Sequence, residues 1–239
     1  MSVPLTSGVP QDITVERDGG RYTTLVPIGL SNAGTVVSVE CNCTPKSHDG
    51  FSFHEFSFDI LRFSGSDVFS IQNRLVARKI LPDGGVHLVL SIVLASYSKL
   101  VQALRPDYIY RVSAFTGLHE PPLRKHLYIT ESLQLAGYNL SEKGRDATGR
   151  SFWLHERATG RSATLFDFPE HPGKLDLAAI DGRKSRIGDY FSDSVHGEMK
   201  LFGAEAAARH KDRVKLALRK YAQDAELRES AARMRGVAA

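Results

Sequence analysis

The longest apolar segment of the chain, Val86–Leu104 (VHLVLSIVLASYSKLVQAL), constrains the fold more than any other feature. It spans about five helical turns, and Arg105-Pro106-Asp107 ends it before a β-rich run at Tyr108–Ala114. A second amphipathic helix is expected over Leu123–Leu135, and a long aromatic strand over Phe51–Phe63. This order of elements predicts an α+β fold with a mixed, mostly antiparallel sheet flanked by helices.

Further strands are indicated by alternating apolar residues and by Gly/Asn-containing turns between them. A change of phase near His54-Glu55-Phe56 predicts a β-bulge in the long aromatic strand. The segment Val68–Lys79 fits either a strand or a helix, and the sequence leaves that choice open. The other expected strands are Ile13–Arg17, Tyr22–Leu30, Thr35–Cys43 and a last hairpin formed by Tyr138–Leu140 and Ser151–His155.

Composition divides the chain into four parts. With 239 residues, 42% hydrophobic and 24% charged, it is long enough for one substantial core. We expect a flexible arm over 1–12, one α/β domain over 13–157, a Pro/Gly-containing charged linker over 158–200, and a basic amphipathic helix over 201–236.

The C-terminal helix carries a narrow apolar stripe, formed by Val214, Leu218, Tyr221 and Ala225. Residues 197–239 hold ten Lys/Arg against six Asp/Glu, which equals the net charge of +4 of the whole chain. The acidic residues are interleaved with the basic ones, so we favour docking on its own domain, on a second subunit or on a host protein over contact with nucleic acid. Because the stripe is narrow, we expect this helix to be separable from the core.

Metal, membrane and export signals are weak. Cys41 and Cys43 alternate on a strand, where two buried reduced thiols are more common than a disulfide or, with His48 and His54, a zinc site. The start of the chain has no basic and apolar leader, and the apolar helix is interrupted by polar residues, so we expect a cytoplasmic protein without membrane contact.

Four segments of the chain are FSFHEFSFDILRF, VHLVLSIVLASYSKLVQALRPDYIYRVSAF, LRKHLYITESLQLAGY and GRSFWLHER. Together they resemble the GNAT fold of acyl-CoA N-acetyltransferases, particularly divergent members from phages and plasmids. In that family a strand leads to a long helix, and a Pro-Asp-hydrophobic stretch opens the next strand. A Leu-Tyr pair on the following helix then precedes a Gly-aromatic pair, the places of Leu127-Tyr128 and Gly137-Tyr138 here. The resemblance covers residues 50–157.

The resemblance implies acetyl-CoA as cofactor and direct attack of an amine on its thioester. Tyr128 would then protonate the departing thiolate, and Glu55 would serve as the base. Family members hold the pyrophosphate with a glycine-rich turn at the start of the long helix, where N–H groups meet the positive helix end. This chain departs from that motif and offers Gly84 and Gly85, with Arg78 and Lys79 close by in sequence.

Two functions follow from these observations. In the first, the chain is an acyl-CoA-dependent N-acyltransferase acting on a small-molecule or protein amine. In the second, the same fold is catalytically silent and belongs to a binding module of a mobile element that contacts a host protein or nucleic acid. No P-loop, Gly-x-Ser-x-Gly nucleophile elbow or His-Glu-x-x-His pair occurs in the sequence.

Overall fold

The computed structural model describes the protein over ten stretches of the chain. Their limits are residues 9–10, 12–18, 20–30, 34–64, 67–81, 85–116, 120–146, 150–158, 193–200 and 212–220. The expected arm over 1–12 and helix over 201–236 therefore lie largely outside the described residues.

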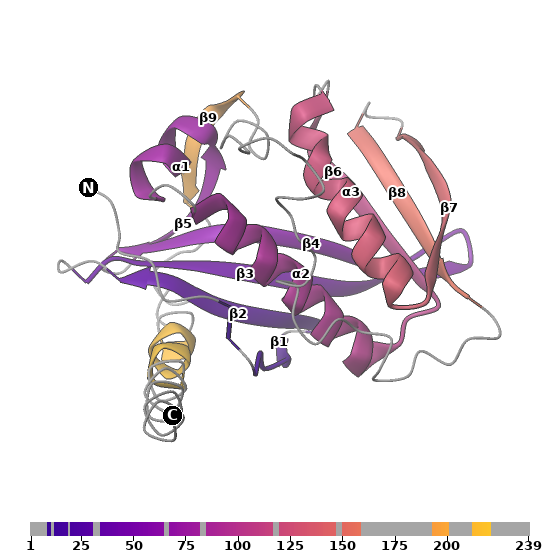
Figure 1. Cartoon of the computed structure of the whole chain (residues 1–239), viewed down its shortest axis with the longest axis horizontal. Helices are drawn as coiled ribbons and strands as arrows, with labels where there is room; N and C mark the ends of the chain where they lie inside the picture. The colour runs from indigo at the N-terminus through magenta and orange to yellow at the C-terminus, as the bar shows by residue number, and fades with distance from the viewer. Residues whose placement is uncertain are drawn as a thin grey trace, which may run out of the picture.

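The described strands form one nine-stranded sheet with the order β1-β2-β3-β4-β6-β8-β7, and β5 joins β4 to β9 (Figure 1). All neighbours are antiparallel except β4 and β6, so the sheet is mixed and mostly antiparallel, as predicted. The strands are β1 (Glu16–Asp18), β2 (Arg21–Leu30), β3 (Val36–His48), β4 (Phe51–Ser64), β5 (Asp67–Asn73), β6 (Tyr108–Thr116), β7 (Tyr138–Arg145), β8 (Arg150–Arg157) and β9 (Asp193–Lys200).

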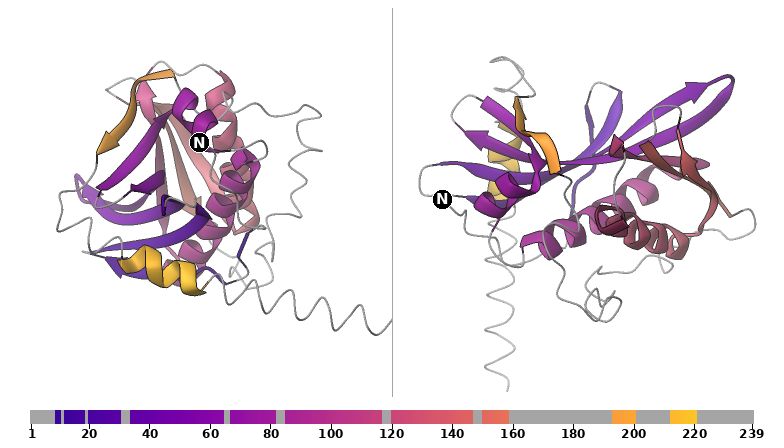
Figure 2. Two further views of the ribbon diagram at one scale, coloured as in Figure 1. Left: turned by 90° about the vertical axis from the view of Figure 1, so that its left-hand side faces the viewer. Right: turned by 90° about the horizontal axis from the view of Figure 1, so that it is seen from above.

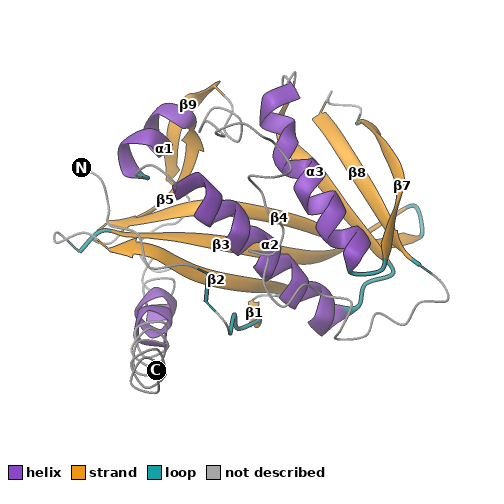
Figure 3. Cartoon of the chain, in the orientation of Figure 1, coloured by secondary structure: helices purple, strands orange, loops and turns teal. Residues whose placement is uncertain are grey.

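Helices α1 (Arg74–Ile80), α2 (Gly85–Leu104) and α3 (Glu120–Leu135) lie on one side of the sheet (Figure 3). We call the sheet surface under them the inner face and the opposite surface the outer face. The helices predicted over Val86–Leu104 and Leu123–Leu135 are thus confirmed, while the undecided segment Val68–Lys79 contains most of β5 and most of the short helix α1. Strand β9 lies within the range for which the sequence predicts a linker, and it pairs with β5.

Helix α2 supplies much of the main core. Ile92, Val93, Leu94 and Leu100 have no exposed side-chain surface and pack with the inner face of β2, β3 and β4. Over His87–Leu104 this helix is long and apolar enough to cross a membrane by length and composition, and half of that window is buried in the domain. Core helices commonly have the same composition.

The turn between β3 and β4 explains why these two strands are longer than the sequence indicates. Asp49 and Gly50 have φ values of 49° and 79°, and His48 pairs directly with Phe51. This two-residue turn with positive φ at both positions suits the right-handed twist of a hairpin. The strand therefore continues through residues 44–48, beyond Cys43, where the strand predicted from the sequence ends.

The predicted bulge near His54-Glu55-Phe56 is wrong, since the pairing of β3 with β4 runs from Val36 to His48 without a register shift. The change of phase has another cause. Phe51 and Phe53 lie on the outer face, whereas Phe56 and Ile60 belong to the main core on the inner face. Farther along β4, Leu61 and Phe63 belong to a second cluster on the outer face. Apolar residues therefore occur at consecutive positions without an irregular backbone.

The second cluster is covered by a helix at residues 212–220. Val214 is 2% exposed and packs with Leu25, Val36, Leu61, Phe63 and Val68, and Leu218 packs at its margin. Figure 2 shows this helix against β2, away from α2 and α3. The described part of the C-terminal segment thus docks on its own domain through two residues of the predicted stripe.

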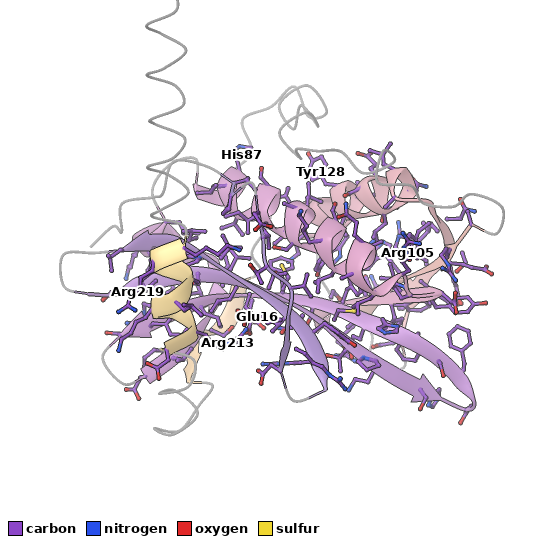
Figure 4. All side chains as sticks on the ribbon, turned by 90° about the horizontal axis from the view of Figure 1, so that it is seen from below. Glu16, His87, Arg105, Tyr128, Arg213 and Arg219 are labelled. Atoms are coloured by element: carbon purple, nitrogen blue, oxygen red, sulfur yellow. The ribbon has the colours of Figure 1, made fainter. Side chains whose placement is uncertain are left out.

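Ion pairs between the helix and the sheet also stabilise this docking. Arg213 Nε lies 2.9 Å from Glu16 Oε2, and its Nη1 lies 3.4 Å from Glu40 Oε1. The Glu40 side chain is only 4% exposed, so Arg213 supplies a cation to a buried carboxylate. In Figure 4 Arg213 points toward Glu16, whereas Arg219 lies on another side of the same helix.

We predict that Arg213→Ala lowers the free energy of unfolding by about 1–3 kcal/mol, because it leaves the buried Glu40 carboxylate without its cation. Arg219→Ala is the matched control, since Arg219 is exposed on the same helix. Urea denaturation of both variants measures the difference. Equal stability of the two variants would mean that the Glu40 ion pair does not hold the helix.

Candidate functional site

The candidate site is a gap in strand pairing along one side of β4. On that side β6 pairs with His54 and Glu55, and β5 pairs with residues from Leu61 to Ser64. Within the described residues no strand pairs with Phe56–Ile60 on this side, and we call these five residues the open edge of β4. Unpaired backbone groups at such a position are available to an extended ligand.

Side chains from three elements meet at the open edge. Lys125 of α3 places its Nζ 5.2 Å from the centroid of the Phe58 ring, a cation–π contact. On the outer face, Ser70 of β5 donates a hydrogen bond of 3.0 Å to Asp59 Oδ1. The site therefore presents an amine from the helical side and a carboxylate from the other side of the same strand.

The two charged groups at the open edge have shifted pKa values. Burial lowers the pKa of the Lys125 amine to about 8, and the Asp59 carboxylate partly opposes that shift. Burial also raises the pKa of Asp59, against the hydrogen bond from Ser70. Both shifts favour the neutral forms, so the Lys125 amine loses its proton at a lower pH, and the Asp59 carboxylate keeps its proton to a higher pH, than an ordinary surface lysine or aspartate.

The structure does not bring Tyr128 and Glu55 together. Tyr128 lies on α3, is 5% exposed and belongs to the main core on the helical side of the sheet (Figure 4). Glu55 pairs with Tyr110 on β6, whereas its neighbour His54 pairs with Ile109, a residue of the main core. Because alternate residues of a strand point to opposite faces, Glu55 lies on the outer face.

The residues expected to hold a pyrophosphate are only partly described. Gly85 is the first residue of α2, at the end of that helix where N–H groups are unpaired. Lys79 is exposed on the short helix α1. Gly84 and the side chain of Arg78 lie outside the described residues, so the cradle itself stays a prediction.

A second cluster of polar groups is buried between α3 and the strands β6 and β8. Arg111 is 1% exposed, and its Nη2 donates a hydrogen bond of 2.7 Å to Thr130 Oγ1. Its Nη1 lies 3.4 Å from His126 Nδ1, and its Nη2 lies 3.4 Å from His155 Nε2. A guanidinium only donates, so both ring nitrogens accept and both imidazoles are neutral.

The electrostatics of this cluster agree with neutral imidazoles. Burial lowers the pKa of Arg111 to about 9, and no described carboxylate forms an ion pair with it. Burial, and then the Lys125 and Arg111 charges, hold the pKa of His126 well below its ordinary value. Burial and the Arg111 charge lower the pKa of His155 to about 3. The stacking of His126 on Trp153, at 3.9 Å between ring centroids, fixes the first ring.

The outer face of β4, β6 and β8 carries a row of aromatic rings. Phe51 lies 4.5 Å from Tyr108, Phe53 lies 5.5 Å from Tyr110, and Tyr110 lies 5.8 Å from Phe152, measured between centroids. The Phe152 ring lies over Gly144, where a Cβ would come within 3.1 Å of it. Phe51 is 40% exposed, so this aromatic row reaches the surface.

The two cysteines lie on the inner face of β3, where both are buried and free of disulfides. Burial raises the pKa of each thiol far above its ordinary value, so neither is a ready nucleophile or metal ligand. Among the described residues no group of His, Cys, Asp or Glu is arranged to hold a metal ion.

The chain matches no protein-family model, and comparisons with curated proteins and with solved structures also gave no match.

Sequence reasoning missed Asp59 and Lys125. Asp59 interrupts an otherwise apolar part of β4, between Phe58 and Ile60, which is a signal that could have been used. Lys125 lies in a polar stretch of α3 and has no such signal. Its place beside β4 depends on the order of strands, which no local pattern encodes.

We predict that stability falls as the pH is lowered below 6.5. The unfolded chain takes up protons on His126 and His155 there, while the folded protein does not, so each histidine costs up to about 1.4 kcal/mol per pH unit. Urea denaturation between pH 8 and pH 5 measures the slope of the free energy of unfolding against pH.

His155→Gln should reduce the slope by about half, because the Gln side chain can accept from Arg111 and does not titrate. His48→Gln is the control, since its side chain is 82% exposed and lies outside the buried cluster around Arg111. A wild-type slope near zero down to pH 5 would contradict neutral buried imidazoles.

Proposed function

We propose that the chain binds acetyl-CoA along the open edge of β4 and transfers its acetyl group to an amine, as an N-acyltransferase-like protein. The observation that carries this proposal is the five-residue gap in pairing between β5 and β6. The arm of coenzyme A that bears the thioester contains amide groups, which can hydrogen-bond to an unpaired strand edge. The reactive carbonyl then lies near Phe58 and Lys125.

The order of elements supports the same proposal. Strand β4 leads through β5 and α1 to the long helix α2, and α2 returns the chain to β6, which is parallel to β4. Ligands of such units bind near the carboxyl ends of the parallel strands. Gly85 begins α2, so its first turn can offer N–H groups to the pyrophosphate, with Lys79 as a cation.

In this proposal the acceptor amine attacks the thioester carbonyl directly, and a base removes the amine proton. Asp59 belongs to the open edge, but its carboxylate lies on the outer face, as that of Glu55 does, so the sheet separates both candidate bases from Tyr128. Tyr128, on the helical side, keeps the role that the family resemblance implies, which is to protonate the departing thiolate. The acceptor is a small molecule or a protein amine.

A catalytically silent binding module is the second candidate. It is favoured by the separation of Tyr128 and Glu55 on the two sides of the sheet, which leaves the expected acid and base apart. It is also favoured by the aromatic row on the outer face, since partly exposed aromatic rings are common at protein interfaces. Its partner is a host protein or nucleic acid.

We predict that acetyl-CoA raises the melting temperature of the full chain. At a ligand concentration about 100 times Kd, the stabilisation is about 2.7 kcal/mol, which corresponds to roughly 5–10 °C for a chain of this size. ATP at the same concentration is the control for unspecific phosphate binding. The absence of any shift at millimolar acetyl-CoA would leave the binding module as the surviving candidate.

We predict that Tyr128→Phe abolishes acetyl transfer to an amine and leaves the acetyl-CoA-induced shift intact. The buried hydroxyl contributes about 1 kcal/mol to stability, so the melting temperature should fall by only roughly 2–4 °C. A coupled assay of released thiol measures the activity. Full activity of this variant would give Tyr128 a packing role alone.

A further inference from the structure

Lys125 is positioned differently from an ordinary surface lysine. It lies on α3 beside the open edge of β4, and its Nζ lies 5.2 Å from the centroid of the Phe58 ring of that edge. Asp59, the next residue of the open edge, interacts with it electrostatically. An acyl thioester placed along this edge therefore meets an amine that belongs to the protein itself.

The environment of Lys125 also favours the reactive form of that amine. With its pKa lowered to about 8, about a tenth of the Lys125 side chains are neutral at pH 7. An ordinary lysine, with a pKa near 10.4, has fewer than about one in a thousand. Only the neutral amine has the lone pair that attacks a carbonyl carbon.

We propose that Lys125 is a self-acylation site, and that the chain transfers a short acyl group from acyl-CoA to its own Lys125 Nζ. This inference rests on the proposed binding of acyl-CoA at the open edge. The Nζ lone pair forms a bond to the thioester carbonyl carbon, and the carbon–sulfur bond breaks. The nitrogen loses one proton, and the departing coenzyme A thiolate takes one up from the solvent. The products are an Nζ-acyl-lysine and free coenzyme A, with no change in oxidation state.

The modification changes the site in a defined way. Acylation removes the positive charge of Lys125 and with it the cation–π contact to Phe58. It also removes the positive charge that helps to hold the pKa of His126 down. The acyl-lysine then occupies the place of the transferred acetyl group, so the modified protein should bind acetyl-CoA more weakly.

The test incubates the purified full chain with acetyl-CoA and maps the modified residues by peptide mass spectrometry. We expect one acetyl group per chain at Lys125, none at that position in Lys125→Arg, and unchanged labelling of Lys125 in the control Lys215→Arg. Lys215 is exposed on the C-terminal helix, far from the open edge in sequence. The rate at Lys125 should rise with pH and level off above about pH 8, where its amine is neutral. An ordinary lysine continues to react faster toward pH 10.

The outcomes separate this inference from the proposed function. If acetyl-CoA raises the melting temperature but Lys125 stays unmodified, the self-acylation site is overturned and the acyl-CoA site stands. If Lys125 is labelled no faster than exposed lysines, with no plateau near pH 8, the inference is overturned as well. If acetyl-CoA neither binds nor labels the chain, both proposals fall.

Discussion

Two residue pairs join the two halves of the sheet, His54 with Ile109 and Glu55 with Tyr110. A parallel pair needs a long crossover connection, and here α2, together with β5 and α1, provides it. Beyond these two pairs the strands diverge, and the packing of α2 and α3 on the inner face supports the junction in place of hydrogen bonds. On the outer face the aromatic row crosses the same junction, with Phe53 on one strand and Tyr110 on the next. The open edge of β4 is the direct consequence of this divergence, and so is the access of an α3 side chain to Phe58.

The burial of Arg111 links α3 to the second half of the sheet. A buried cation without a carboxylate partner is costly, and the structure offsets part of this cost with hydrogen bonds to Thr130 and to the His126 carbonyl. Two neutral imidazoles complete the arrangement, and they accept only while they stay unprotonated. The same groups that fix the position of α3 therefore make the protein sensitive to acid. Since α3 also carries Lys125, the geometry of the open edge depends on this buried cluster.

The sequence predicts the elements better than the site. The helix over Val86–Leu104 and the strand Phe51–Phe63 are visible because their apolar residues repeat at short intervals. The turn at Asp49-Gly50 has a sequence signal, the Asp-Gly pair, which lies beyond the strand predicted to end at Cys43. In contrast, Asp59 and Lys125 lie far apart in the chain, and only the strand order brings them to one edge. The separation of Tyr128 from Glu55 likewise depends on the register of β4 with β6, which no residue pattern specifies.

The position of the C-terminal helix limits which part of the outer face a partner can contact. Its basic residues do not all face outward, because Arg213 forms ion pairs with Glu16 and Glu40, and Lys220 forms one with Asp12. The helix covers only the part of the outer face around β2 and the second half of β4. The aromatic row lies on the remaining part, over β4, β6 and β8. Charges around that row are of both signs, such as Arg150 paired with Asp146 and Arg157 paired with Asp107. A surface of paired charges and aromatic rings suits a protein partner better than the phosphates of a nucleic acid, whose binding requires an excess of positive charge.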